Sequence, residues 1–462
     1  MGTNKDQAQS YKFMLQRVTS ALTVHETDPE QPPFRRPVLA AIGGIVIGAL
    51  IMVGFWVYGL IVPGGDQFQG TDVIVVEEET GARFVLLNGK LHPVLNYTSA
   101  LLALDKHAAV EMVPKASLVG IPVGPPIGIP DAPDSLPGTG ELVTGAWSMC
   151  DQSTVDDQGR RSDSPVLLVG QPPNPASTPR DHALLVHSGN RVYVIHEGYR
   201  HEITDGVNVA LELDKETAAS VSGAWLDTIP VGKPIGPLAL AEAGRPTNVA
   251  VPTMTLLSGQ VLEVQNGTSN PVATPTYYLV TGDQLQQISA LQATVQRALG
   301  PHAEPPVPVN NRDLVGAELA PPRRSAEDDP PTSRPTFLTV NSAEVTVCAT
   351  FEPGATVPSL VVGAAMPASI PDAPEGEIRV AVPPGKAAVI EVMASPSEPP
   401  GQGTLALVND QGRLYPLAEP NVLGVLGLDG ATPVRITAVL ADRVPKGRSL
   451  SPDAARTPVT GN

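Results

Sequence analysis

Aromatic side chains are scarce in this chain of 462 residues, at 4%, whereas 50 residues are proline and 43 are glycine. Proline and glycine interrupt regular elements, so this composition predicts many short elements joined by turns and few long helices. The hydrophobic fraction, 42%, is ordinary for a globular protein, and the length allows about three domains.

Basic residues are also in short supply. Lys and Arg number 30 against 47 Asp and Glu, which gives a net charge of −17. Such a chain lacks the positive surface needed to wrap nucleic acid or to adsorb to anionic lipid. We therefore expect no nucleic-acid partner.

Sequence motifs for catalysis are missing. The Gly-Lys pairs that begin at Gly89, Gly232 and Gly385 lack both the upstream glycine and the following Ser or Thr of a phosphate-binding loop. Two His-Glu pairs, beginning at His196 and His201, stand five residues apart, not the four of a zinc-protease helix. The sequence therefore predicts no catalytic residue, no cofactor and no metal site.

One long apolar segment is present. The run from Val38 to Val62 carries no charge, and about 20 apolar residues suffice to cross a bilayer. A cleaved signal peptide is the alternative, but the run starts late in the chain and no A-x-A site follows it. Arg35 and Arg36 precede the run and Asp66 is the first charge after it. The positive-inside rule then places residues 1–37 in the cytoplasm and the remainder outside.

Small residues repeat along one face of this predicted transmembrane helix. Ala40, Gly44 and Gly48 stand four residues apart. Such spacing lets a second helix approach closely, so this face is a candidate contact for a partner helix.

The cytoplasmic tail contains one patterned stretch. Apolar residues recur there at the spacing of one helix face, namely Tyr11, Met14, Leu15, Val18 and Leu22. An isolated helix of this length is marginal in water, so it needs lipid or another protein to lie against. Its modest charge favours a protein partner over adsorption to lipid.

A repeated unit dominates the rest of the chain. Four copies, at 80–104, 188–213, 276–299 and 403–428, each show a strand, a glycine turn, a second strand and a short helix. A glycine-proline tail follows two copies, as VGPPIGIP at 123–130 and VGKPIGPL at 231–238, with a weak echo at Val444–Pro452. A unit this small cannot bury its own apolar face, so each copy must pack on a neighbour.

Two proline-rich stretches between the copies contain one cysteine each, Cys150 and Cys348. Both cysteines lie beyond the predicted transmembrane helix, where thiols are usually oxidised. We expect one disulfide, with two buried free thiols as the alternative, and closing a loop of this length would contribute about 4 to 5 kcal/mol. The segment Pro301–Pro335, which contains PPRRSAEDDPPTSRP, is predicted to be a mobile loop.

The predicted fold class is α+β, with one transmembrane helix and repeat units around a central β-rich domain closed by the disulfide. The predicted parts are a cytoplasmic tail at 1–37, the transmembrane helix at 38–62, the first repeat at 63–130, a first central stretch at 131–180, the second repeat at 181–245, the third repeat at 246–304, a second central stretch with the mobile loop at 305–400, and the fourth repeat with a C-terminal tail at 401–462.

Several of these segments together resemble the EccB family of type VII (ESX) secretion systems. The resemblance rests on SYKFMLQRVTSAL at 10–22, the single transmembrane helix, TGARFVLLNGKLHPVLNYTSALLAL at 80–104, and two widely spaced cysteines. It implies a structural subunit of an inner-membrane complex that exports WXG-type proteins. The implied partners are an FtsK-like ATPase, a polytopic channel-like subunit, other membrane subunits and copies of this chain.

Three functions remain open from the sequence. The first is an assembly scaffold whose tail helix and transmembrane helix bind other subunits. The second is a cell-envelope module in which the repeats bind peptidoglycan and the membrane segment is only an anchor. The third is an ATPase, because members of the family are often given that name, although the chain has no phosphate-binding loop.

Overall fold

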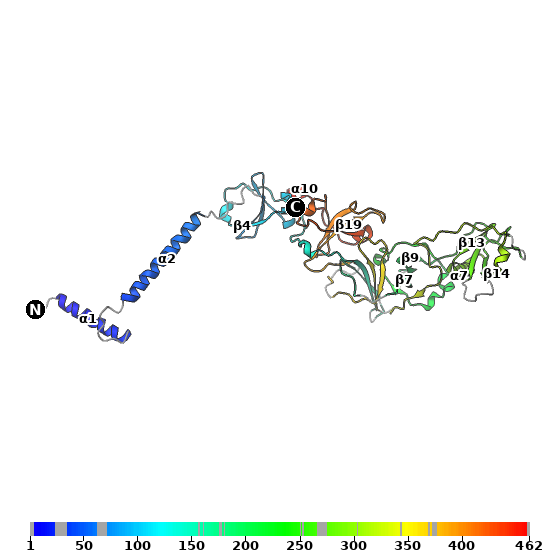
Figure 1. Ribbon diagram of the computed structural model, residues 1–462, viewed down its shortest axis with the longest axis horizontal. Coiled ribbons are helices and arrows are strands. Elements are labelled where there is room, and N and C mark those ends of the chain that lie inside the picture. Colours follow the sequence, from blue (N-terminus) through cyan, green and yellow to red (C-terminus); the bar gives the residue numbers. More distant parts are fainter. Residues whose placement is uncertain are drawn as a thin grey trace. The chain divides into compact units, whose positions relative to one another are not determined.

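The computed structural model (Figure 1) describes residues 4–23, 35–61, 72–155, 158–159, 161–174, 178–179, 181–249, 251, 254–265, 275–302, 304–341, 344–367, 370–371 and 377–459. The chain divides into two compact units, Met1–Ala82 with Val110–Pro122, and Arg83–Ala109 with Val123–Asn462.

The first unit begins with the two longest described helices. Its elements are α1 (Asn4–Thr23), α2 (Arg35–Ile61), β1 (Ile74–Glu77), β4 (Val110–Val113) and α4 (Lys115–Leu118). Neither proline nor glycine interrupts α1, and the only proline of α2, Pro37, lies in its first turn, where the missing N–H breaks no helical hydrogen bond. Strands β1 and β4 pair in parallel, with Ile74 opposite Val110.

The second unit is built mainly from the repeats. The first copy contributes β2 (Arg83–Leu87), β3 (Lys90–Pro93) and α3 (Tyr97–Leu104). The second contains β7 (His182–Ser188), β8 (Arg191–His196), β9 (Tyr199–Glu202), α5 (Val207–Ala210), η2 (Leu213–Lys215), β10 (Ala219–Ser220) and α6 (Gly223–Leu226). The third contains β11 (Val261–Gln265), β12 (Thr276–Thr281), β13 (Gln284–Ile288), α7 (Ala290–Leu299), β14 (Val307–Asn310) and η3 (Asn311–Leu314). The fourth contains β19 (Ala388–Met393), β20 (Thr404–Val408), β21 (Leu414–Pro416), α8 (Val422–Val425), β22 (Val434–Thr437) and α9 (Ala438–Ala441).

The second, third and fourth copies share one sheet topology. The predicted hairpin and helix are present in each, and the structure adds one strand before them and one after. In the fourth copy Ile390 of β19 lies opposite Ala406 of β20 on one side and opposite Val434 of β22 on the other. The last pairing is parallel, which requires a crossover, and the short helix supplies it. The unit is therefore a four-stranded sheet with a helical crossover.

The glycine-proline tails lie in parallel beside the third strand of the first, second and fourth copies. Val123 bridges to Leu91 in the first copy, and Val231 bridges to Arg200 in the second. The weak echo at Val444–Pro452 is a true tail, because Lys446 and Leu450 bridge to the fourth copy's β21 and the residue after it.

The structure corrects two assignments in the predicted central stretch at 305–400. Strand β14 pairs with β11, and Leu319 bridges to Leu285, so residues 307–319 belong to the third copy. Strand β19 belongs to the fourth copy. These errors share a cause, because the two strands are the last and the first of their copies and lie outside the hairpin and helix by which the copies are recognised in the sequence.

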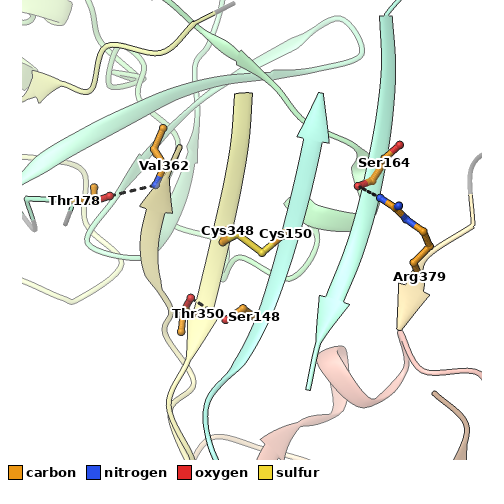
Figure 2. Close-up of a disulfide and its surroundings, with 8 residues drawn as sticks. All are labelled: Ser148, Cys150, Ser164, Thr178, Cys348, Thr350, Val362 and Arg379. Carbon is orange, nitrogen blue, oxygen red and sulfur yellow. Dashed lines mark hydrogen bonds between the residues drawn. A yellow bond between two sulfur atoms is a disulfide. The ribbon is translucent and has the colours of Figure 1, made fainter. Parts of the chain in front are cut away.

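The central domain is a sheet of five strands in the order β17-β16-β5-β6-β18. Its strands are β5 (Trp147–Val155), β6 (Arg161–Leu168), β16 (Glu344–Phe351), β17 (Ser359–Val362) and β18 (Arg379–Ala381), while β15 (Thr336–Phe337) joins β7, and η1 (Thr139–Glu141) and α10 (Pro452–Arg456) lie outside the sheets. The predicted disulfide is confirmed: Cys150 and Cys348 lie opposite each other on β5 and β16, 198 positions apart in sequence and with 3.9 Å between their Cα atoms (Figure 2).

The main hydrophobic core joins three parts of the chain. Trp147 and Met149 alternate with Cys150 along β5 and are buried with side chains of the second and fourth copies, such as Trp225 and Ile390. Complete burial of an aliphatic side chain contributes about 1.5 to 3 kcal/mol. The central sheet is therefore the surface on which these two copies bury their apolar faces.

The copies also pair through their helices. Helix α3 of the first copy packs against α10, and the Arg456 Nε donates to the Ala103 carbonyl over 2.9 Å. Helix α5 of the second copy packs against α7 of the third, where Val207, Leu211 and Val295 share one core. The prediction that each copy needs a neighbour agrees with these pairs.

The segment predicted to be a mobile loop makes many contacts. Lys233 of the second copy binds Asp329 at 2.7 Å and Asp328 at 3.1 Å, and Arg334 binds Glu216 at 2.6 Å. These ion pairs fasten the described part of the segment to the second copy, in contrast to the mobility that its composition predicts.

An acidic side chain is buried between the central sheet and the second copy. Asp151 is 1% exposed, and its carboxylate accepts the Ser222 N–H over 2.6 Å. Its other oxygen has no partner among the described residues. Burial raises the pKa of Asp151 to about 6, because the charged form loses its hydration.

Removing the disulfide should weaken the whole second unit. We expect Cys150→Ala combined with Cys348→Ala to lower the stability by about 4 to 5 kcal/mol, because the unfolded chain regains the freedom of a long loop. Urea denaturation of the full chain in detergent, with and without reductant, measures this loss. An unchanged midpoint in both the variant and the reduced chain would contradict it.

Replacing the buried carboxyl should stabilise the chain at neutral pH. The folded pKa of Asp151, about 6, lies above the ordinary 3.8. The stability that the protonated carboxyl contributes is therefore full below about pH 3.8 and is lost as the pH rises through 6. Asp151→Asn should recover up to about 3 kcal/mol at pH 7.5 and little at pH 4. Urea midpoints at both pH values test this, with the exposed Glu419→Gln as control. A variant less stable at pH 7.5 would show that the ionised form is favoured.

Candidate functional site

Helix α1 presents the apolar face that the sequence predicts. Its five candidate partner-binding side chains lie on that face and are between 49% and 76% exposed, namely Tyr11, Met14, Leu15, Val18 and Leu22. Phe13 was not among the predicted residues. It is 58% exposed, lies away from this face, and carries the Arg17 guanidinium over its ring at 5.7 Å. The role of the five residues in partner binding stays a prediction.

Helix α2 has the length and composition of a transmembrane helix. Residues Val38–Tyr58 have a mean hydropathy of 2.6, and no part of this segment is buried. The helix, Arg35–Ile61, is longer than the roughly 30 Å hydrocarbon layer requires. Val62, the predicted outer end, lies outside the described residues.

The small-residue face of α2 is uncovered in the described structure. Apart from the neighbouring backbone of its own helix, a Cβ atom placed on Gly44 or Gly48 would meet no atom within 4 Å. A partner helix that used this face would therefore approach without displacing any described side chain. Such a contact remains a prediction.

Of the two histidines that the sequence analysis considered, His201 has a structural role in the second copy. The His201 ring covers Gly232, and its Nδ1 lies 2.8 Å from the Lys233 carbonyl oxygen. In the first copy the His92 ring covers Gly124 in the same way. Burial lowers the pKa of His201. Among the described residues no group of three or more His, Cys, Asp or Glu side chains is placed to hold a metal.

The sequence analysis missed this ring-on-glycine contact, although its signal is visible. An aromatic or imidazole ring on the third strand faces a glycine of the tail, and in the fourth copy the pair is Tyr415 and Gly447. In sequence this is KLHP with VGP, YRHE with VGK, and RLYP with KGR. The glycine is required because any side chain there would collide with the ring.

The described arrangement thus offers binding surfaces and a rigid frame. The two cysteines are brought together, whereas the tail helix and the transmembrane helix leave their candidate faces open. Exposed helix faces and a disulfide-closed frame suit a protein that holds others in place.

Known proteins share this organisation. A family model described as type VII secretion system ESX-1, transport TM domain B, matches residues 2–460. The ESX-3 secretion system ATPase EccB3 of Mycobacterium tuberculosis (strain ATCC 25618 / H37Rv) is 27% identical over 439 residues, which cover 89% of this chain and 80% of that protein. Its namesake in Mycolicibacterium smegmatis (strain ATCC 700084 / mc(2)155) is 26% identical over 478 residues, which cover 97% and 89%.

Solved structures show the same fold. A chain of the intact ESX-5 inner membrane complex superposes with a TM-score of 0.64 at 22% identity, covering 100% of this chain and 96% of that one. The EccB3 dimer from the ESX-3 core complex gives a TM-score of 0.65 at 22% identity, covering 83% of this chain and 100% of that one. With a family model that spans nearly its whole length, the chain belongs to the EccB family of type VII secretion systems.

Proposed function

We propose that this chain is a structural scaffold subunit of a type VII secretion complex in the inner membrane. The observation that carries the proposal is the joining, in one chain, of an exposed amphipathic helix and an apolar membrane helix to a large disulfide-closed frame of repeats. Each part serves attachment or rigidity. Two solved structures with this fold belong to an ESX inner membrane complex and an ESX core complex.

The proposed orientation places α1 in the cytoplasm and the repeats outside. Arg35 and Arg36 at the start of α2 support it through the positive-inside rule. The disulfide supports it independently, because structural disulfides form and persist in oxidising compartments outside the cytoplasm.

The proposed partners follow from these positions. Helix α1 offers its apolar face to cytoplasmic and membrane subunits, among them an FtsK-like ATPase and a polytopic channel-like subunit. Copies of this chain associate with one another, and the related EccB3 is a dimer in the ESX-3 core complex. The complex would export WXG-type proteins.

The relatives carry the word ATPase in their names. A phosphate-binding loop needs backbone N–H groups of a glycine-rich turn, a lysine and a Ser or Thr for magnesium, and this sequence contains no such loop. We propose that ATP hydrolysis in the complex belongs to the FtsK-like partner. Peptidoglycan binding by the repeats is the competing function, in which α1 has no part.

Charges on the apolar face of α1 should release the partners. Leu15→Asp with Leu22→Asp places two carboxylates where an apolar contact is expected, so co-purification of other secretion subunits should fall by about tenfold or more. Gln9→Asp with Gln16→Asp adds the same charges on the opposite side of the helix as the control. Membrane insertion, which depends on α2, should be unchanged in both. If both variants co-purify the same amount of the other secretion subunits, the docking role of α1 is refuted.

Purification in gentle detergent from the native membrane tests the proposal as a whole. We expect a particle far heavier than the 48.1 kDa chain, with ATP hydrolysis that disappears when the partner ATPase is stripped away. A lone monomer that still binds isolated cell wall would instead support the envelope-binding function. Hydrolysis by the isolated chain would show that it has a nucleotide site of another kind.

A further inference from the structure

The segment that leads from the third copy back to the second is open at its middle. All residues from 321 to 327, called the bridging segment below, are exposed, and residues 321–326 belong to no helix, strand or turn. Within the described part of the chain, no backbone–backbone hydrogen bond involves residues 321–325. Pro321 and Pro322 contribute to this, because proline has no N–H and neither continues a helix nor joins the interior of a sheet.

Both ends of the bridging segment are fixed. On one side the Ala320 N–H donates to the carbonyl of Leu285, in β13 of the third copy, over 3.0 Å. On the other side the Lys233 N–H of the second copy donates to the Asp328 carbonyl over 2.8 Å, and the Lys233 ammonium binds Asp329 at 2.7 Å. A segment that is held at both ends and unbonded between them keeps its peptide groups accessible.

The bridging segment also has free space beside it. Arg323, Arg324 and Ser325 line a cleft of about 200 Å³, together with residues of β13 and α7 such as Gln287 and Gln292. The segment is therefore not packed closely against the third copy at this point. Proteolytic cleavage concentrates at exposed segments of this kind, because an endopeptidase needs a stretch of backbone that it can bind without first unfolding the protein.

Two adjacent arginines in the bridging segment have little counter-charge. Arg323 lies 3.7 Å from Asp329, a carboxylate that Lys233 already binds at 2.7 Å. No ion pair joins Arg324 to another residue that the structure describes. In a chain with a net charge of −17, two exposed and adjacent cationic side chains form a local signal that an acidic binding pocket can recognise.

We propose that the Arg324–Ser325 peptide bond is a processing site for an endopeptidase that cleaves after paired basic residues. The hydroxyl of a water molecule joins the Arg324 carbonyl carbon, the C–N bond breaks, and the remaining proton goes to the Ser325 nitrogen, so the step needs no oxidant or reductant. An acidic pocket in the endopeptidase would hold the Arg324 guanidinium, as in proteases that select a basic side chain before the cut. This inference goes beyond the scaffold function and does not rest on it.

The disulfide determines what the cut produces. The cut falls inside the loop closed by Cys150 and Cys348, so the fragments 1–324 and 325–462 stay covalently joined. The third copy loses the covalent connection that follows it and keeps the one that precedes it, together with the contact of α7 with α5. Cleavage therefore loosens the attachment of the third copy without releasing a fragment.

The fourth copy contains a matched control bond. Arg448–Ser449 joins the same two residue types, and both are exposed, but the N–H groups of Gly447 and Leu450 on either side bind carbonyls of β21. We expect a low amount of trypsin to cut the full chain in detergent after Arg324 about tenfold or more faster than after Arg448, because the control bond must first open locally. In urea the two rates should be similar. Equal rates in the native chain, read by mass spectrometry, would overturn the proposal.

A second measurement asks whether the cut is made in the native membrane. The purified chain is run on denaturing gels with and without reductant, and the fragment ends are identified by mass spectrometry. We expect a fragment that begins at Ser325 and separates only with reductant. Arg323→Gln with Arg324→Gln should abolish this fragment, whereas Arg448→Gln should leave it unchanged. Recovery of intact wild-type chain alone under reductant, or the same fragment from the double variant, would also overturn the proposal.

Discussion

Strands β5 and β16 pair residue by residue from Thr154 opposite Glu344 to Trp147 opposite Phe351. This contact joins two parts of the chain about 200 positions apart, and the disulfide fixes it at its middle. Closing so long a loop is costly in entropy, so the pairing depends on a covalent bond and on a buried surface to hold it. The second and third copies lie between β5 and β16 in the sequence, so the segment that contains them begins and ends at this contact.

The remaining architecture follows from the small size of the repeat. A four-stranded sheet with one crossover helix has an apolar face that it cannot cover by itself, and solenoid proteins solve this problem by stacking neighbours in sequence order. This chain solves it in another way. The second and fourth copies share the core of the central sheet, the second also pairs with the third, and α3 of the first copy is covered by α10 near the end of the chain.

Much of this was accessible from sequence because its signals are local. The hairpin turns carry glycine at positions with positive φ, such as Gly89 and Gly198, and the apolar run of α2 needs no context to be recognised. The position of the two cysteines beyond the predicted transmembrane helix indicated that they would pair. Strands β14 and β19, the last and the first strand of their copies, escaped because long connections and not tight turns join them to the predicted hairpins. The contacts of residues 301–335 escaped for a related reason, since ion pairs such as Lys233 with Asp329 depend on the fold and not on composition.

The position of the second and third copies between β5 and β16 affects the order in which the parts of the chain can pair. If the N-terminus stays in the cytoplasm, the remainder crosses the membrane from residue 63 onward, and Cys150 emerges long before Cys348. Until the second cysteine arrives, β5 lacks its partner strand and the second copy lacks part of the core that buries Trp225. The contact between α5 and α7 lies wholly within the intervening copies, whereas the cover of α3 needs α10, which follows β16 in the chain. In this order of emergence, oxidation of Cys150 and Cys348 is the step that closes the loop containing the second and third copies.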